Sequence, residues 1–145
     1  MKSAHIYLTF DGNCKEAFEF YHKVLGGTLQ ISGTFADIPP GDDGQPAFPE
    51  DQHDRLMHVT LSIGNDIMIF GSDTGGEWSK TFIPGNNFSI SLDSDSKEEA
   101  ESLFESLSEG GHVIMPMGNT FWNSYYGMCV DKFGVQWMIS FDMSS

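Results

Sequence analysis

Hydrophobic and polar positions change their period within the first part of the chain. Residues 6–10 alternate apolar and semi-polar side chains, which is typical of a strand with one buried face. Over residues 14–25 the apolar positions recur every three or four residues, which predicts an amphipathic helix. Residues 11–13, Asp-Gly-Asn, offer turn and capping chemistry before this helix, and Gly26-Gly27 ends it. A second strand should then run to about Phe35.

The same order recurs in the second half. Residues 88–92 alternate, residues 93–96 carry the Asp and Ser side chains that cap helices, and residues 97–109 predict a helix that Gly110-Gly111 ends. Each half then closes with two strands in a hairpin. These hairpins are residues 56–63 with 67–70, joined by Gly64-Asn65-Asp66, and residues 125–130 with 135–141. The sequence therefore predicts two βαβββ modules.

We expect one α+β domain over residues 1–145. Its first module occupies residues 1–73 and its second module residues 84–145. An insertion at residues 37–54 is too rich in Pro, Gly and Asp to form a regular element, and a further linker runs through residues 71–87. Long loops of this kind in a compact domain are often lids or partner contacts.

Three stretches carry a family resemblance: residues 11–21 (DGNCKEAFEFY), 120–128 (TFWNSYYGM) and 131–138 (DKFGVQWM). Together they resemble the PhnB-like branch of the vicinal-oxygen-chelate superfamily, which includes glyoxalase, bleomycin resistance proteins and extradiol dioxygenases. The resemblance covers the chain outside the insertion. It implies an eight-stranded, cup-like mixed sheet made by the two modules, a small-molecule pocket inside the cup and, in many relatives, a homodimer and a bound divalent metal.

The resemblance also indicates where a metal would bind. Metal-dependent relatives place ligands at the start of each module's first strand and on a last strand. In this chain those positions hold His5, Asn87, Met68 and Met138. His5 suits a divalent metal, whereas an amide is a weak ligand and a thioether is too soft for hard or borderline cations. The ligand set is therefore incomplete, no cofactor is assigned, and a divalent metal on His5 is the alternative.

Strand alternation assigns each side chain to the helix side or to the cup. On the helix side we expect Ile6, Leu8, Phe10, Met57, Val59, Leu61, Ile63, Phe88, Ile90, Leu92, Trp137, Ile139 and Phe141. The candidate ligand-binding residues in the cup are Tyr7, Thr9, Thr60, Phe70, Asn87, Ser89, Gln136 and Met138. The family resemblance adds Trp122 and Tyr125, which it places at the rim. His5 and His58 are the candidate catalytic residues, because either imidazole could transfer a proton without a metal.

The amino-acid composition limits the classes of partner that the protein is expected to bind. The chain has 21 Asp and Glu against 7 Lys and Arg, a formal net charge of −14, which repels phosphate backbones and anionic lipids. We therefore expect a small-molecule ligand rather than nucleic acid or a membrane. No signal peptide or long apolar run is visible, so a cytoplasmic location with reduced, unpaired Cys14 and Cys129 is expected. Arg55 is the single arginine, which argues against a phosphonate site, and no glycine-rich cofactor loop supports a methyltransferase.

Overall fold

The computed structural model describes residues 1–64 and 66–144, so the predicted turn residue Asn65 lies outside the described part. The chain divides into two compact units, Met1–Pro84 and Gly85–Ser145. None of the helices in the described ranges combines the length and the hydrophobicity that a membrane span requires.

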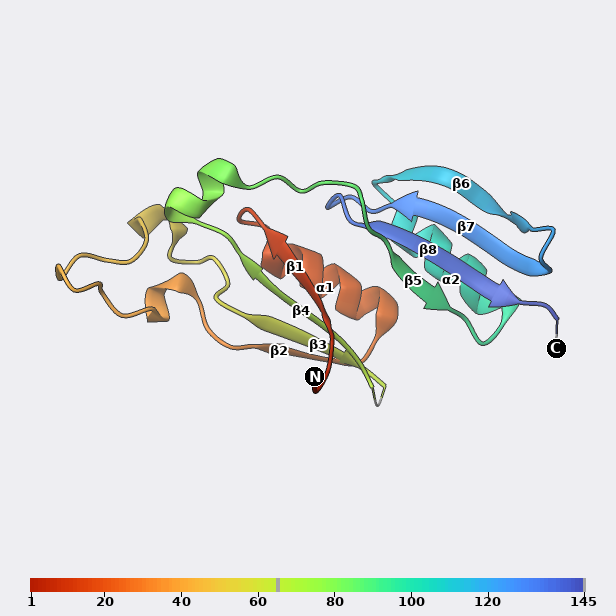
Figure 1. Ribbon diagram of the computed structural model, residues 1–145, viewed down its shortest axis with the longest axis horizontal. Coiled ribbons are helices and arrows are strands. Elements are labelled where there is room, and N and C mark those ends of the chain that lie inside the picture. The colour runs from red at the N-terminus through yellow and green to blue at the C-terminus, as the bar shows by residue number, and fades with distance from the viewer. Residues whose placement is uncertain (65, 145) are drawn as a thin grey trace. The chain divides into compact units, whose positions relative to one another are not determined.

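The first module follows the order strand, helix and three strands (Figure 1). Its elements are β1 (Ile6–Phe10), α1 (Cys14–Leu25), β2 (Thr28–Ile31), β3 (Val59–Ile63) and β4 (Ile67–Asp73). They form a four-stranded sheet in the order β1-β4-β3-β2, in which β1 runs parallel to β4 and the other pairs are antiparallel. Short 3₁₀ turns, Phe35–Asp37, Glu50–Gln52 and Gly76–Thr81, interrupt the insertion and the linker.

The second module repeats this arrangement. It contains β5 (Ile90–Asp93), α2 (Lys97–Ser108), β6 (His112–Asn119), β7 (Ser124–Val130) and β8 (Gln136–Asp142). The strand order is β5-β8-β7-β6, again with one parallel pair, β5 and β8. The α+β class and the two predicted βαβββ modules are therefore confirmed, and the strands form two four-stranded mixed sheets.

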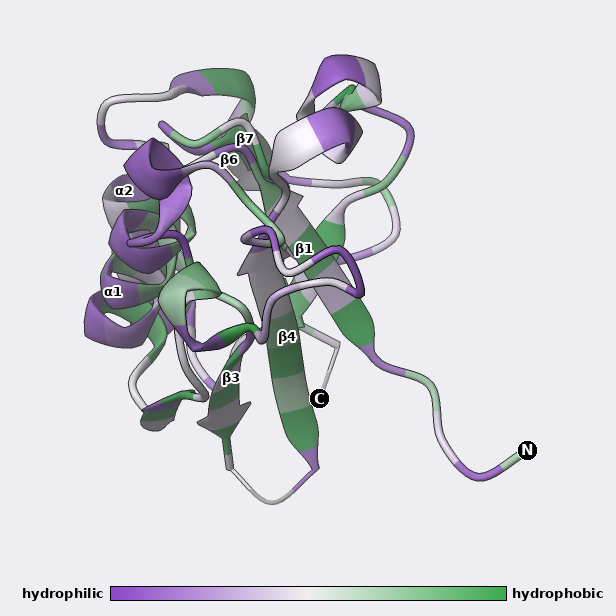
Figure 2. Ribbon diagram, turned by 90° about the vertical axis from the view of Figure 1, so that its left-hand side faces the viewer, coloured by the Kyte–Doolittle hydropathy of each residue, from purple (hydrophilic) through white to green (hydrophobic). Residues whose placement is uncertain are grey.

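In each module the core lies between the helix and one face of the sheet. Figure 2 shows hydrophilic outer surfaces on both helices and largely hydrophobic β3 and β4. The predicted helix-side residues that are buried are Leu8, Phe10, Val59, Leu61, Ile90, Trp137 and Ile139. Ile6 lies on the helix side, in register with buried Ile69, but is 36% exposed at the start of its strand. The prediction is wrong for Met57 and Phe88, which are 38% and 49% exposed. Met57 and Phe88 precede the first residues of β3 and β5, so the strand alternation does not apply to them.

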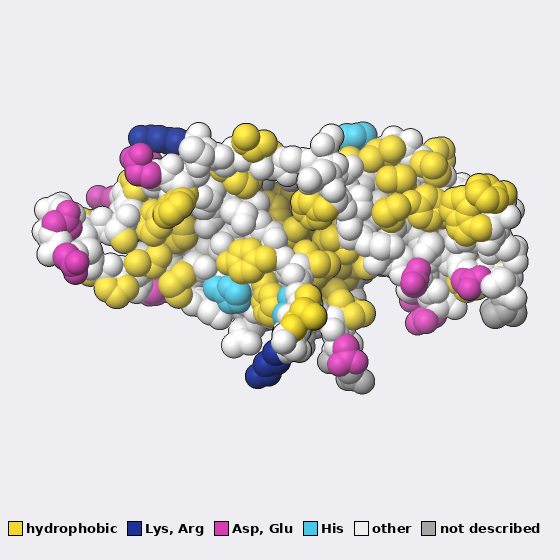
Figure 3. All heavy atoms as spheres, in the orientation of Figure 1, with side chains coloured by type: hydrophobic (Ala, Val, Ile, Leu, Met, Phe, Trp, Pro, Cys, Tyr) yellow, Lys and Arg dark blue, Asp and Glu magenta, His cyan; other side chains and the backbone are white. Residues whose placement is uncertain are grey.

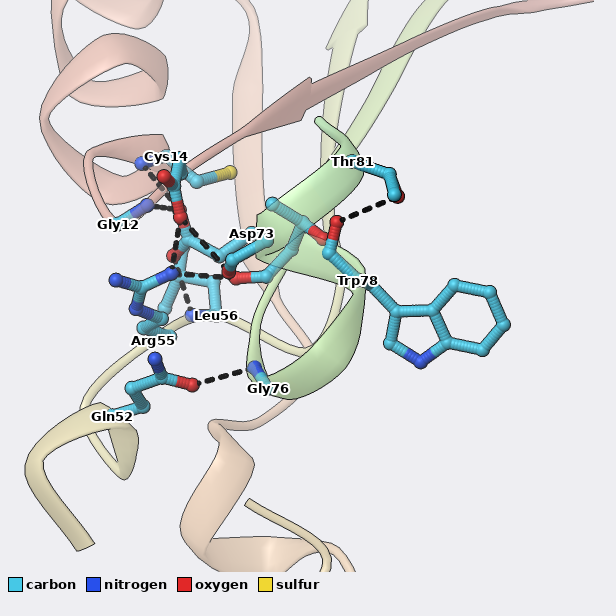
Figure 4. Close-up of polar contacts among 12 residues, drawn as sticks. Gly12, Cys14, Gln52, Arg55, Leu56, Asp73, Gly76, Trp78 and Thr81 are labelled. Atoms are coloured by element: carbon cyan, nitrogen blue, oxygen red, sulfur yellow. Dashed lines mark hydrogen bonds and ion pairs between the residues drawn. The ribbon is translucent and has the colours of Figure 1, made fainter. Parts of the chain in front are cut away.

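The amino end of α1 is held by a buried carboxylate from the far end of β4 (Figure 4). Asp73 Oδ1 accepts hydrogen bonds from the amides of Gly12 (2.8 Å) and Cys14 (3.0 Å), and its Oδ2 accepts one from Leu56 (2.8 Å). The prediction that residues 11–13 cap the helix is therefore wrong: the Asn13 side chain makes no cap hydrogen bond, and the capping carboxylate comes from Asp73. Asp73 ties the start of the helix to the sheet.

The second helix uses a local cap, as predicted. Ser96 Oγ accepts a hydrogen bond from the Glu99 amide (3.0 Å), while Glu99 Oε1 accepts one from the Asp95 amide (3.1 Å). This reciprocal pattern satisfies two amides that have no partner inside the helix. Gly110, with a positive φ of 78°, follows the helix, as Gly26 with the same φ follows α1.

Candidate functional site

Four rings gather on the face of the first sheet that points away from α1. Tyr7 on β1 and Thr60 on β3 are both in register with Phe70 on β4, so their side chains share one face. The opposite face carries buried residues such as Leu8, Leu61 and Ile69, which pack toward the helix side. His5 and His58 precede β1 and β3 and add two imidazoles to the same group.

The rings contact one another in pairs. The centroid of Phe70 lies 5.0 Å from that of His5, in an edge arrangement, and 5.6 Å from that of His58. Tyr7 lies 5.9 Å from His58. The Thr60 hydroxyl is 3.3 Å from His58 Nε2, which places a polar group within this cluster. Figure 3 shows histidine side chains among hydrophobic ones on the surface over this sheet.

Two open hollows flank the ring cluster within the first module. One, of about 390 Å³, is lined by His5, Ile6 and Met68 among others. The other, of about 370 Å³, includes Thr9 and the aromatic residues Phe48 and Trp78. The insertion and the linker therefore supply part of the surface beside the expected ligand-binding residue Thr9, which sequence periodicity did not indicate.

In the second module a hollow of about 490 Å³ lies at the carboxyl ends of β5 and β8. The expected residue Trp122 lines it, together with Tyr126, Asp93, Ser140 and Asp142. Tyr126 is in register with Ser140, and Ser140 with Asp93, so these side chains lie on one face of the sheet. Tyr126 and both carboxylates are absent from the residues that the sequence indicated.

Tyr125 lies on the helix side instead of at the rim of this hollow, which corrects the expectation. Its hydroxyl donates a hydrogen bond of 2.8 Å to Glu101 on α2, and Lys97 Nζ lies 4.7 Å from the centre of its ring. The hydrogen bond to Glu101 raises the pKa of Tyr125. Gly127 and Cys129 are buried on the same side, and this alternation of small buried residues was the available signal that Tyr126 faces the other way.

The other expected residues of the second module occupy varied positions. Asn87 is exposed and precedes β5, and Ser89 is half-buried just before the strand. The Gln136 side-chain amide donates a hydrogen bond of 3.0 Å to the Phe88 carbonyl, which uses one of its two N–H groups. Met138 is half-buried and pairs in register with Ser91 and Met128. Of the residues expected in this module, Trp122 is the one that lines the hollow of the second module, and the ligand-binding role of the others stays a prediction.

The side chains at the family's metal positions do not fit a divalent metal. Of His5, Met68, Asn87 and Met138, only the imidazole is a good ligand for such an ion, and the two thioethers suit softer ions. Within residues 1–64 and 66–144, no group of three or more His, Cys, Asp or Glu side chains is placed to share a metal ion. No chemical step through a metal is therefore derived for this chain.

The side chain of the single arginine makes hydrogen bonds within the first module. Arg55 Nη1 donates to Asp11 Oδ1 at 2.7 Å and to the Thr74 carbonyl at 2.8 Å (Figure 4). The hydrogen bond from Arg55 also holds the pKa of Asp11 below its ordinary value. Because this guanidinium already has a carboxylate partner, it is a poor receptor for a phosphate or phosphonate.

Both cysteines are free, as expected, and both are buried. Burial raises the pKa of Cys14, and the negative charge of Asp73 raises it further. Burial, followed by the charge of Asp131, raises the pKa of Cys129 to about 11. A thiol that stays protonated at neutral pH is a weak nucleophile, so neither cysteine suits covalent catalysis.

The repeated modules define a protein of the glyoxalase/bleomycin resistance/dioxygenase fold. A protein of this class from Burkholderia phytofirmans superimposes with a TM-score of 0.61 at 15% identity, covering 95% of this chain and 98% of that one. A PhnB protein of Bacillus cereus superimposes with a TM-score of 0.71 at 23% identity, covering 97% and 99% of the two chains. Both likenesses concern the fold.

The sequence comparisons then define the family. The profile of the 3-demethylubiquinone-9 3-methyltransferase family matches residues 2–140. Protein YjdN of Escherichia coli K12 is 32% identical over 139 residues, 92% of this chain and 91% of the relative. Protein PA1353 of Pseudomonas aeruginosa is 43% identical, with a TM-score of 0.81 and coverage of 97% and 98%. The chain belongs to this PhnB-like family.

Proposed function

We propose that this PhnB-like chain binds a small planar or aromatic molecule with polar substituents on the ring-bearing face of the first sheet. The observation that carries the proposal is the contact network of His5, Tyr7, His58 and Phe70, with centroid separations of 5.0 to 5.9 Å. Aromatic rings bury large areas and prefer edge or offset contacts, so a partly exposed group of rings favours a planar ligand. Tyr7 is 51% exposed, which leaves much of its ring open to such a ligand.

Polar groups at the cluster would orient the ligand. The imidazoles of His5 and His58 each offer a donor or an acceptor, and the Thr60 hydroxyl lies beside His58. A pocket with an apolar wall and few polar groups is the usual composition of a small-molecule site. The same imidazoles are the candidates for proton transfer to or from a bound ligand, should turnover accompany binding.

Methyl transfer, which the family description names, is not part of this proposal. The connection from β1 to α1 contains a single glycine, Gly12, rather than a glycine-rich loop. The amides of Gly12 and Cys14 at the start of the helix, which in nucleotide folds often bind anions, are occupied by Asp73. At this position, therefore, these two backbone amides are not available to bind the phosphate or carboxylate groups of a methyl-donor cofactor.

Thermal denaturation with a panel of planar heteroaromatic compounds tests the proposal, since a ligand that binds only the folded state raises the midpoint. We expect hits whose affinity falls roughly threefold to tenfold in Tyr7→Ala, in keeping with about 0.5–1.5 kcal/mol for an aromatic pair. His58→Gln should weaken the hits that carry polar groups. His112→Gln is the matched control, because this exposed histidine lies in the second module. The proposal would be refuted if no compound of the panel raised the midpoint, or if Tyr7→Ala and His58→Gln left the affinity of the hits unchanged.

A further inference from the structure

The hollow of the second module has a different chemistry from the ring cluster of the first. It has a volume of about 490 Å³, within the usual range of small-molecule pockets. The side chains that line it are acidic, hydroxylic or aromatic, and none is Lys, Arg or His. It lies where β5 and β8 end, whereas the family's metal positions in this module, Asn87 and Met138, lie toward the strands' beginnings.

Two carboxylates face this hollow without a cationic partner. Asp93 Oδ1 accepts a hydrogen bond of 2.7 Å from Ser140 Oγ, and Asp142 Oδ1 accepts one of 2.9 Å from the Ser144 amide. Neither carboxylate takes part in an ion pair within the described residues. These hydrogen bonds all end on Oδ1, and within residues 85–144 no hydrogen bond reaches Oδ2 of either side chain, so negative charge remains available at the hollow.

Two aromatic rings form a corner beside these carboxylates. The ring centroids of Trp122 and Tyr126 are 5.9 Å apart with an interplanar angle of 68°, and Trp122 is 54% exposed. The short loop before β7 is well defined: the Thr120 amide donates to the Ser124 carbonyl at 2.8 Å, and the Ser124 amide donates to Thr120 Oγ1 at 3.0 Å. The indole is thus presented by a hydrogen-bonded turn.

Ser94 also lines the hollow, and its Oγ has no hydrogen-bond partner among the described residues. Buried polar atoms are nearly always paired, so this hydroxyl lacks a partner that it would ordinarily have. Because Oγ is shielded from solvent, the side chain must rotate into the hollow before an ammonium group can donate to it.

From this combination we infer that the hollow binds an organic cation, namely an ammonium group attached to an apolar or aromatic substituent. The carboxylates of Asp93 and Asp142 attract the charge, and the faces of Trp122 and Tyr126 bind an ammonium by cation–π attraction while covering its apolar part. A hydrated metal ion would use the carboxylates but gain little from the exposed ring of Trp122 and the half-buried ring of Tyr126. The formal net charge of −14 adds a long-range attraction for cations.

The probe pair phenethylammonium and 2-phenylethanol tests the inference, because the two differ chiefly in the positive charge. Titrations of the full chain are followed by calorimetry and by the NMR signals of the indole N–H groups of its three tryptophans. Phenethylammonium should shift the signal of Trp122, assigned with Trp122→Phe, and leave that of Trp78 in the first module unchanged. The alcohol should bind at least about tenfold more weakly, which corresponds to about 1.4 kcal/mol.

Matched variants separate a built site from general attraction by an acidic surface. Asp142→Asn and Asp93→Asn should each weaken phenethylammonium binding about threefold to tenfold, since each removes one charge from the hollow. Asp95→Asn removes the same charge from an exposed side chain outside the hollow and should change the affinity less than twofold. An unmoved Trp122 signal, equal binding of the alcohol, tighter binding of Ca²⁺ than of phenethylammonium, or an equal effect of Asp95→Asn would each overturn the inference.

Discussion

Replacing Asp73 with asparagine should destabilise the first module by about 3 kcal/mol, and the value follows from the hydrogen bonds that the carboxylate accepts. Asp73 is 6% exposed and accepts from the amides of Gly12, Cys14 and Leu56. Asparagine keeps one acceptor oxygen, which can serve Gly12 and Cys14, but it turns an amino group toward the Leu56 amide. The change removes a charge-assisted hydrogen bond, roughly 1.5–3 kcal/mol, and leaves a buried donor unpaired at roughly 1–3 kcal/mol, two costs that partly overlap.

Urea denaturation followed by far-UV circular dichroism measures this effect. With a slope of about 2 kcal/mol/M, a loss of about 3 kcal/mol lowers the midpoint by about 1.5 M. Asp95→Asn is the matched control, since it makes the same charge change at an exposed side chain and should stay within about 0.5 kcal/mol of the parent chain. If Asp73→Asn and Asp95→Asn unfold at the same urea concentration, the buried carboxylate does not hold the start of α1 as described.

Two further predictions concern the second cap and the cysteines. Ser96→Ala should cost about 1 kcal/mol, because Ser96 Oγ accepts the Glu99 amide. Asn13→Ala should cost less than half of this, because the Asn13 side chain makes no cap bond; equal shifts of the unfolding midpoint for both variants would contradict the assignment. Iodoacetamide at pH 8 should modify Cys129 very slowly in the folded chain, since a pKa of about 11 leaves about one thiol in a thousand ionised. Both cysteines should react rapidly in urea, and rapid native labelling would show that the thiols are accessible.

Sequence periodicity predicted the helices and most strands because burial on one face imposes a regular spacing. The first helix spans Cys14–Leu25 as its pattern indicates, and the second spans Lys97–Ser108, one residue shorter than predicted. The alternation of apolar and polar residues gave wrong predictions beyond the ends of the hydrogen-bonded strands. Phe88 and Met57 continue the alternation in sequence, but neither belongs to a strand, so no pleat directs their side chains toward the helix.

The candidate sites were less accessible to sequence reasoning. Tyr7, Thr60 and Phe70 were placed correctly on one face because their strands are regular. Tyr125 was expected at the pocket rim from the family resemblance, but its hydroxyl bonds to Glu101 on α2, on the side of β7 where Gly127 and Cys129 are buried. Asp93 and Asp142 became candidates only once the pairing of β5 with β8 brought the ends of these strands, 49 residues apart in the chain, into one sheet.

The two modules share a fold but satisfy the amino ends of their helices in different ways, and this difference bears on where a ligand can bind. In the first module the cap is Asp73, which lies 59 residues from Cys14 and is fully used by backbone amides. In the second module Ser96 and Glu99 cap α2 from within the local sequence. Among the described residues neither Asp93 nor Asp142 accepts a hydrogen bond from an amide of α2, so both carboxylates keep an oxygen that the start of the helix does not use. The duplication thus accounts for the shared architecture, while the cation-binding chemistry inferred for the second module depends on carboxylates that its local helix cap leaves free.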